Sequence, residues 1–208
     1  MKKIVLVGKP NSGKSLLFNQ LTGLRQKVAN YPGVTVELKT GRFEQFELVD
    51  YPGAYSLSSL SRDEEIAVQK LQEAMQLPDT ALVICNLDAT RLESSLVFGL
   101  QVQALAKQQQ KSVVFALNMA DELQRFGHQL DTEALSKALG SPVFAISAKT
   151  LLGISEFRQA VLELAELAQP PIPSIDHGDE KALRALSRSL SRQFGISASI
   201  VLKNQNRI

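Results

Sequence analysis

The sequence predicts an α/β fold in which a mostly parallel six-stranded sheet, with one antiparallel edge strand, carries helices on both faces. Short apolar runs rich in valine and isoleucine alternate with longer segments of helical period, and this alternation is typical of parallel sheets covered by helices. The strand candidates are residues 2–7, 34–39, 42–49, 80–86, 112–118 and 142–147. The helix candidates are residues 15–22, 63–75, 92–109, 131–139 and 155–168.

One pair of strand candidates differs from the others. Residues 34–39 and 42–49 are separated only by Thr40-Gly41, which leaves no room for a crossover helix. Two strands joined so closely pair antiparallel, so we expect a hairpin and one reversed strand at the edge of the sheet.

Composition limits the classes of function. The chain has 208 residues, 44% of them hydrophobic, and a formal net charge of +2. That balance favours neither a nucleic acid nor a membrane surface as partner, and no apolar run approaches the ~20 residues of a membrane-spanning helix. Cys85 is the single cysteine, which excludes an intrachain disulfide and predicts a buried thiol in a reducing cytoplasm.

The first chemical motif follows the first strand candidate and opens the first helix candidate. It reads Gly8-Lys9-Pro10-Asn11-Ser12-Gly13-Lys14-Ser15. A loop with this pattern, between a strand and a helix, wraps backbone N–H groups around phosphates. Lys14 is expected to reach the outer phosphates, and the Ser15 hydroxyl is expected to ligate Mg²⁺.

Two further segments complete the expected phosphate and metal site. Asp50-Tyr51-Pro52-Gly53 ends a strand candidate, where the Asp50 carboxylate can hold Mg²⁺ and the Gly53 N–H can reach the γ-phosphate. Thr35 lies 15 residues before Asp50, and its hydroxyl can complete the Mg²⁺ shell when a triphosphate is bound. The predicted Mg²⁺ ligands are therefore Ser15, Thr35 and Asp50.

The later motifs select the base. Asp121, in Asn118-Met119-Ala120-Asp121, can accept hydrogen bonds from N1–H and the 2-amino group of guanine, and adenine has neither donor. The Ala148 N–H, in Ser147-Ala148-Lys149, can donate to guanine O6. The residues predicted to contact GTP or GDP are Gly8, Lys9, Pro10, Asn11, Ser12, Gly13, Lys14, Ser15, Leu16, Gly33, Val34, Thr35, Asp50, Gly53, Asn118, Met119, Asp121, Ser147, Ala148 and Lys149.

The ordered motifs resemble the P-loop GTPase fold. Residues 30–37 (Asn-Tyr-Pro-Gly-Val-Thr-Val-Glu), residues 50–57 (Asp-Tyr-Pro-Gly-Ala-Tyr-Ser-Leu) and Asn118-Met119-Ala120-Asp121 are similar to the ferrous-iron transport protein B (FeoB) family. The resemblance implies a G domain at the cytoplasmic face of the bacterial inner membrane, tethered to the membrane-embedded Fe²⁺ transporter of the same protein. It also implies small regulatory Feo proteins as partners. The net charge of +2 and the short tail predict no nucleic-acid partner.

The resemblance divides the chain into three parts. Residues 1–168 form the expected G domain, residues 169–175 a proline-rich linker and residues 176–208 a short or truncated helical domain. In the last part, apolar residues recur at helical spacing, and Arg184, Arg188 and Arg192 fall on another face. That face is either solvated or a contact surface for another domain or for lipid.

Hydrolysis needs a separate explanation, because Ala54 stands where many GTPases have a glutamine that orients water. The resemblance implies K⁺ bound by the Asn11 carboxamide beside the phosphates, which would neutralise charge there. Asn11 acting only as a loop stabiliser is the alternative. The expected catalytic set is Asn11, Lys14, Thr35 and Gly53.

The leading hypothesis is thus a slow, K⁺-assisted GTPase that switches an iron transporter. An RNA- or ribosome-associated GTPase and a GTP sensor with negligible hydrolysis remain alternatives. His128 and His177 have no second ligand at metal spacing, so we expect Fe²⁺ to be the cargo of the whole system and not a ligand of this chain.

Overall fold

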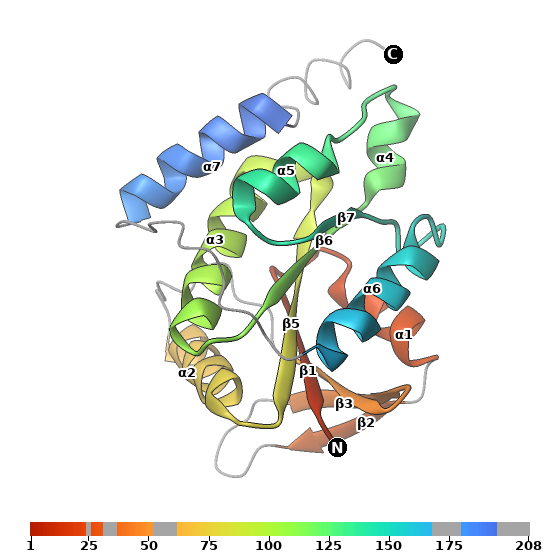
Figure 1. Ribbon diagram of the computed structural model, residues 1–208, viewed down its shortest axis with the longest axis vertical. Coiled ribbons are helices and arrows are strands. Elements are labelled where there is room, and N and C mark those ends of the chain that lie inside the picture. The colour runs from red at the N-terminus through yellow and green to blue at the C-terminus, as the bar shows by residue number, and fades with distance from the viewer. Residues whose placement is uncertain (24–25, 31–36, 52–61, 168–179, 195–208) are drawn as a thin grey trace.

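A seven-stranded mixed sheet forms the centre of the computed structural model (Figure 1), which describes residues 1–23, 26–30, 37–51, 62–167 and 180–194. The order across the sheet is β2-β3-β4-β1-β5-β6-β7. In chain order, the strands are β1 (Lys3–Gly8), β2 (Gln26–Asn30), β3 (Glu37–Phe43), β4 (Phe46–Asp50), β5 (Thr80–Asp88), β6 (Val113–Asn118) and β7 (Val143–Ala145). The predicted fold class is confirmed, with one strand more than expected among the described residues.

The reversed strand is β3, which pairs antiparallel with β4, whereas β4, β1, β5, β6 and β7 pair in parallel. Its predicted position at the edge is wrong, because β2 pairs antiparallel on its outer side. The predicted turn at Thr40-Gly41 is also wrong, since both residues lie within β3. The chain turns at Glu44 and Gln45 instead, where Phe43 and Phe46 face each other across the hairpin and are both buried.

The helices confirm the helical periods, with ends that differ by a residue or two. They are α1 (Lys14–Thr22), α2 (Arg62–Gln76), α3 (Leu92–Gln108), α4 (Ala120–Arg125), α5 (Thr132–Leu139), α6 (Ile154–Glu166) and α7 (Glu180–Phe194), with a 3₁₀ helix η1 at Ala89–Arg91. The short α4 was not predicted. No helix in the described part of the chain is long and apolar enough to cross a membrane.

Alternating residues of the central strands point to two separate hydrophobic cores, one on each face of the sheet. Val5, Val7 and Phe115 pack with residues of α2, α3, α5 and α7 on one face. Ile4 and Leu6 pack with residues of α1 and α6 on the other. Because β1, β5 and β6 are buried on both faces, they read as continuous apolar runs, as strands of a parallel sheet covered on both sides do.

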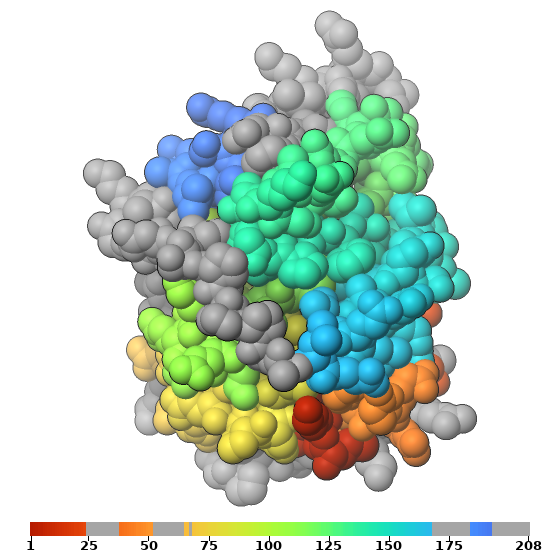
Figure 2. Space-filling view, in the orientation of Figure 1, coloured from red at the N-terminus to blue at the C-terminus, as the bar shows by residue number. Residues whose placement is uncertain are grey.

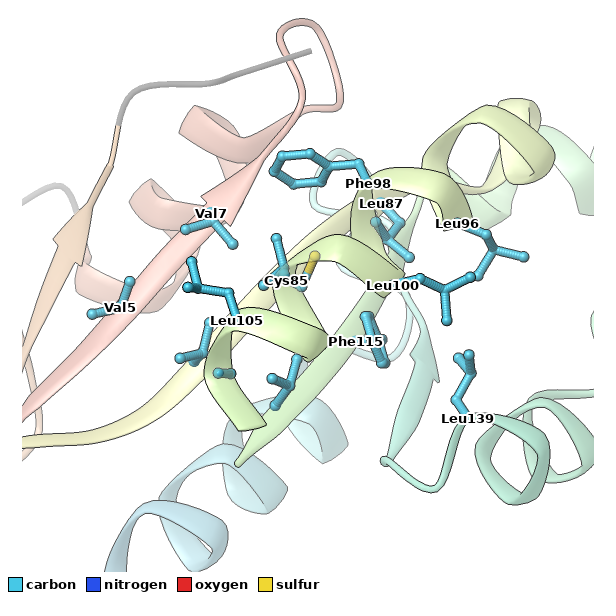
Figure 3. Packing of buried hydrophobic residues seen from close by; sticks show 14 of the residues in the cluster. Val5, Val7, Cys85, Leu87, Leu96, Phe98, Leu100, Leu105, Phe115 and Leu139 are labelled. Atoms are coloured by element: carbon cyan, nitrogen blue, oxygen red, sulfur yellow. The ribbon is translucent and has the colours of Figure 1, made fainter. Parts of the chain in front are cut away.

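Figure 3 shows the first of these cores, where Cys85 of β5 lies among Val5, Val7 and Leu105. The Cys85 side chain is fully buried, which confirms the predicted core thiol. Burial raises the pKa of the thiol, because the thiolate would lose its hydration in this apolar environment.

Helix α7 packs against α3 and α5, as Figure 2 shows for α5. The Ser187 hydroxyl donates to the backbone oxygen of Glu93, and Arg188 Nε lies 3.3 Å from Glu93 Oε1. Leu190 joins the core between them. Arg184, Arg188 and Arg192 are exposed, which is compatible with both roles considered for this face. Arg188 also anchors α7 to the start of α3.

Arg158 of α6 ties three elements together on the opposite face. Its Nη1 donates to the Leu21 carbonyl at 2.8 Å, its guanidinium lies 4.7 Å from the centre of the Phe43 ring, and its Nη2 pairs with Glu44. One side chain thereby joins the end of α1 to the β3–β4 hairpin.

We expect Arg158→Ala to lower the free energy of unfolding by about 1–3 kcal/mol, because it removes a hydrogen bond, a cation–π contact and the packing of the side chain. Urea denaturation measures the change. Arg125→Ala is the matched control, since Arg125 makes only an exposed pair with Glu122 on one helix, and it should cost less than about 0.5 kcal/mol. Equal losses in the two variants would contradict the role given to Arg158.

Candidate functional site

The carboxyl ends of four neighbouring parallel strands meet at one edge of the sheet. The register pairs Leu6 of β1 with Asp50 of β4, Gly8 with Asn86 of β5, and Asp88 with Asn118 of β6. Ligands of open α/β sheets bind outside this edge. The phosphate loop, Asp50 and the base motif, which are far apart in the sequence, therefore converge there.

The phosphate loop connects β1 directly to α1, as the motif requires. Gly13, at the N-cap of α1, has φ = +78°, and a Cβ there would collide with the Asn118 amide. A Cβ on Gly8 would lie 2.8 Å from the Asn86 carbonyl oxygen. Both positions need glycine, one for its left-handed backbone and the other for its close approach to β5.

Ser12 is the most heavily bonded residue of the loop. Its hydroxyl donates to the Lys9 carbonyl at 2.7 Å and accepts from Asn86 Nδ2 at 2.9 Å. Its carbonyl oxygen accepts from Asn86 Nδ2 at 2.8 Å and from Asn118 Nδ2 at 3.1 Å. Side chains from β5 and β6 thus hold the middle of the loop in a defined conformation.

Lys14 joins the loop to the end of β4. Its ammonium pairs with the buried Asp50 carboxylate and donates to the Tyr51 carbonyl at 2.7 Å. Burial lowers the pKa of Lys14, with Lys39 adding to the effect and Asp50 opposing it. The predicted phosphate-binding lysine and the predicted Mg²⁺ carboxylate are therefore in direct contact.

Lys9 points to a different part of the site, where its ammonium donates to the Ser94 carbonyl in α3 at 2.7 Å. Burial, with a smaller contribution from Arg184, lowers the Lys9 pKa. A cavity of about 460 Å³ lies here between the phosphate loop and the start of α3. Its lining includes Lys9, Asn11, Asp88, Arg91 and Met119.

The base motif is organised around Asn118, whose side chain is buried at the end of β6. Its Oδ1 accepts from Met119 N at 2.9 Å and from Ala148 N at 3.0 Å. The Ala148 N–H, which we expected to offer to guanine O6, donates to Asn118 in this structure. Met119 adopts φ = +66° before α4, and Asp121 lies half-buried in the first turn of that helix.

The remaining predicted residues are distributed as follows. Ser147 is buried and its Oγ accepts from Thr150 N at 3.1 Å, whereas Ser15, Leu16 and Lys149 are exposed. Gly33, Val34, Thr35, Gly53, Ala54 and His177 lie outside the described residues. Within the described ranges, no group of three or more histidine, cysteine or acidic side chains is placed to hold a metal. Of the predicted Mg²⁺ ligands, Ser15 and Asp50 lie in the described part of the chain, and both carry the hard oxygen atoms that suit Mg²⁺.

Asn86 was not predicted as part of the site. It follows the apolar run Ala81–Cys85 in β5, so the sequence analysis treated it only as the last residue of a strand. The signal that could have revealed it is an amide in a strand buried on both faces, because a buried polar group requires a partner. Here that partner is Ser12 of the phosphate loop.

Comparison with known proteins agrees with this geometry. Residues 2–161 match the family described as Ferrous iron transport protein B. The "Fe(2+) transporter FeoB" of Legionella pneumophila (strain Paris) is 37% identical over 91% of this chain, and that of Salmonella typhimurium is 39% identical over 85%. The chain spans about a quarter of the length of these relatives, 25% and 24% respectively.

Solved structures give the same result. The cytosolic domain of the T. maritima FeoB iron transporter in a GDP form matches with a TM-score of 0.80 and 27% identity, over 93% of this chain and 99% of that one. The G domain of the same transporter matches with a TM-score of 0.67 and 39% identity, over 80% and 99%. The fold is therefore that of a FeoB G domain, and the chain belongs to the ferrous iron transport protein B family.

Proposed function

We propose that this chain is the GTP-binding and GTP-hydrolysing switch domain of a bacterial Fe²⁺ membrane transporter. The observation that carries the proposal is the meeting of Lys14, Asp50, Asn118 and Asp121 at one sheet edge. These residues come from three separate segments, the phosphate loop, the end of β4 and the base motif, and have the chemistry that a guanine nucleotide with Mg²⁺ needs. Solved T. maritima relatives in GDP and GMPPNP forms support guanine nucleotide as the ligand.

The phosphates would bind where the loop meets the start of α1. Lys14 already lies there, held between two oxygens, the Asp50 carboxylate and the Tyr51 carbonyl. A phosphate group would compete for the ammonium as a stronger anionic partner. Asp50 and the Ser15 hydroxyl would then hold Mg²⁺, with Thr35 as the third protein ligand. The ion, when bound, neutralises charge on the phosphates.

The base would lie against α4 and the segment after β7. Asp121 would accept from N1–H and the 2-amino group, and Ala148 N–H would donate to O6. The Asn118 amide is the brace of this pocket, since it contacts the phosphate loop, Met119 and Ala148 at once. The exposed Lys149 would cover one face of the base by its long apolar stem.

The partner would be the membrane-embedded remainder of the same protein, because the relatives named Fe²⁺ transporters are about four times as long as this chain. The chain would then lie at the cytoplasmic face of the inner membrane, within reach of small regulatory Feo proteins. Residues 169–175 would act as the linker and residues 176–208 as a short or truncated helical domain, of which α7 is the described part.

Hydrolysis would be slow and assisted by K⁺. Asn11 has φ = +63° at the exposed front of the phosphate loop. A carboxamide oxygen there can ligate a monovalent cation beside the phosphates, where positive charge stabilises the transition state. Asn11, Lys14, Thr35 and Gly53 form the proposed catalytic set.

Asp121→Ala tests the choice of base. The wild-type chain should bind GDP and exclude ADP, and the variant should bind GDP about a hundredfold more weakly with little preference left, because guanine loses its charged acceptor. Competition against a fluorescent GDP analogue measures both affinities. Glu133→Ala removes an exposed carboxylate of α5, which pairs with Lys137, and should leave binding unchanged. Equal affinity of the wild-type chain for GDP and ADP would contradict the proposal.

The Lys14 pKa gives a pH dependence. Only the protonated amine attracts phosphate, and burial lowers its pKa in the free protein. Bound phosphate raises that pKa again, so GDP affinity should stay level near neutrality and fall as pH rises through the free-protein value, which lies below that of an ordinary lysine. Isothermal titration from about pH 7 to about pH 10 checks this. In Lys14→Arg, the fall should move beyond that range, and an unchanged fall would assign it to another group.

The cation hypothesis predicts faster single-turnover GTP hydrolysis in KCl than in NaCl, by about tenfold or more. Asn11→Ala should lose that difference while still binding GDP, because the side chain acts on the reaction and not on the loop's shape. Equal rates in KCl and NaCl for the wild-type chain would contradict the proposal that K⁺ assists hydrolysis. A difference between KCl and NaCl that persists in Asn11→Ala would show that Asn11 is not the K⁺ ligand.

A further inference from the structure

We propose that Asn86 is a positioning residue of the phosphate loop, which holds the Ser12 carbonyl against the sheet so that the Gly13 N–H faces the phosphates. The inference rests on the proposed nucleotide site and assigns a role to a residue that contacts the loop but not the ligand. It follows from the hydrogen bonds of Ser12, the geometry of one peptide unit and the cost of burying an amide.

Asn86 and Asn118 both bind Ser12 of the phosphate loop. Asn86 is fully buried near the end of β5, directly beside Gly8 in the parallel register. Its Nδ2 donates both to the Ser12 carbonyl at 2.8 Å and to the Ser12 hydroxyl at 2.9 Å. Asn118 Nδ2 donates to the same carbonyl from β6 at 3.1 Å. One carbonyl oxygen is therefore held by amides from two strands of the rigid sheet.

The geometry of the peptide unit means that these hydrogen bonds also orient the Gly13 N–H. The Ser12 carbonyl and the Gly13 N–H belong to one planar trans peptide unit, so they point in opposite directions. Holding the carbonyl toward β5 and β6 therefore aims the Gly13 N–H away from the sheet edge. Gly13 is the N-cap of α1, where N–H groups and the helix dipole favour an anion.

The amide of Asn86 has an energetic cost at its buried position. Among the described residues, Asn86 Oδ1 is a buried atom without a hydrogen-bond partner. Leaving such an acceptor unpaired costs free energy, and an apolar side chain of similar size would avoid that cost at this buried position. The two hydrogen bonds to Ser12 are the contribution of this amide that an apolar side chain could not make.

Gln103 offers a matched control within the same chain. It is also a buried amide, its Nε2 donates to the Leu139 carbonyl at 2.8 Å and to the Ser141 hydroxyl at 2.7 Å, and its Oε1 is likewise unpartnered. These contacts fix the end of α5 and do not involve the phosphate loop. Asn86→Leu and Gln103→Met therefore make the same chemical change at two places.

The test measures GDP affinity and unfolding by urea for the 208-residue chain and both variants. Asn86→Leu should raise the GDP dissociation constant about tenfold to a hundredfold, the effect of releasing a buried carbonyl from its donor. Gln103→Met should change it less than about threefold. A folded Asn86→Leu that binds GDP as tightly as the wild-type chain, or an equal loss in Gln103→Met, overturns the proposal.

A second ligand separates loop positioning from damage to the base pocket. Inosine diphosphate lacks the 2-amino group but keeps both phosphates, so its affinity relative to GDP reports the contact of Asp121. That ratio should be the same in Asn86→Leu and in the wild-type chain, because both nucleotides lose the same phosphate contact. A changed ratio would show that Asn86 acts on the base, and would also overturn the proposal.

One measurement needs no variant and applies even if Asn86→Leu does not fold. In the ¹⁵N-labelled wild-type chain, GDP should move the Gly13 amide proton downfield, because an N–H aimed at phosphate gains an anionic acceptor. Gly23 is the control, since it has a similar φ of +63° and its N–H donates to the Asn19 carbonyl. A Gly13 resonance that stays in place while GDP binds rejects the assigned orientation. If GDP does not bind at all, the proposed function fails instead.

Discussion

The whole site depends on the parallel pairing of β4, β1, β5 and β6. Each strand ends in a different chemical element of the site: Asp50, the phosphate loop, Asn86 and Asn118. Parallel pairing brings these ends to one edge of the sheet. Burial on both faces fixes the register, because a slip of one residue would turn every side chain of a strand toward the opposite core, where it would not fit. The geometry of the candidate site is thus a consequence of the packing on both faces of the sheet.

The phosphate loop is rigid for a related reason. A loop of small residues has many conformations, and ordering it on binding would reduce affinity. Here Ser12 and Lys14 tie it to three strand ends, and Lys9 ties it to α3. Helix α7 holds the same first turn of α3 through Ser187 and Arg188. The phosphate loop and the C-terminal helix therefore share one support.

The parts that the sequence predicted well are those whose signal is local. The phosphate loop, the buried Cys85 and the helix ends follow from periodicity and short motifs. The hairpin turn was misplaced because Thr40-Gly41 looked like a turn, while the burial of Phe43 and Phe46 in the core beneath α1 and α6 places it at Glu44 and Gln45. Strand β2 was not predicted, because its sequence Gln-Lys-Val-Ala-Asn has no apolar run, and it joins the sheet by pairing with β3. Asn86 was missed because its partner is 74 residues away.

The two buried amides have one more consequence for how this site can change. Asn86 and Asn118 hold the backbone of the loop at Ser12 while carrying no charge, whereas Lys14 supplies a positive charge and also joins the loop to the end of β4. A carboxylate at position 86 could not donate to the Ser12 carbonyl, and it would place a negative charge beneath the phosphates. Because the two amides that hold Ser12 are uncharged, a change of charge at the exposed front of the loop, at Asn11 or Ser15, would leave these hydrogen bonds in place.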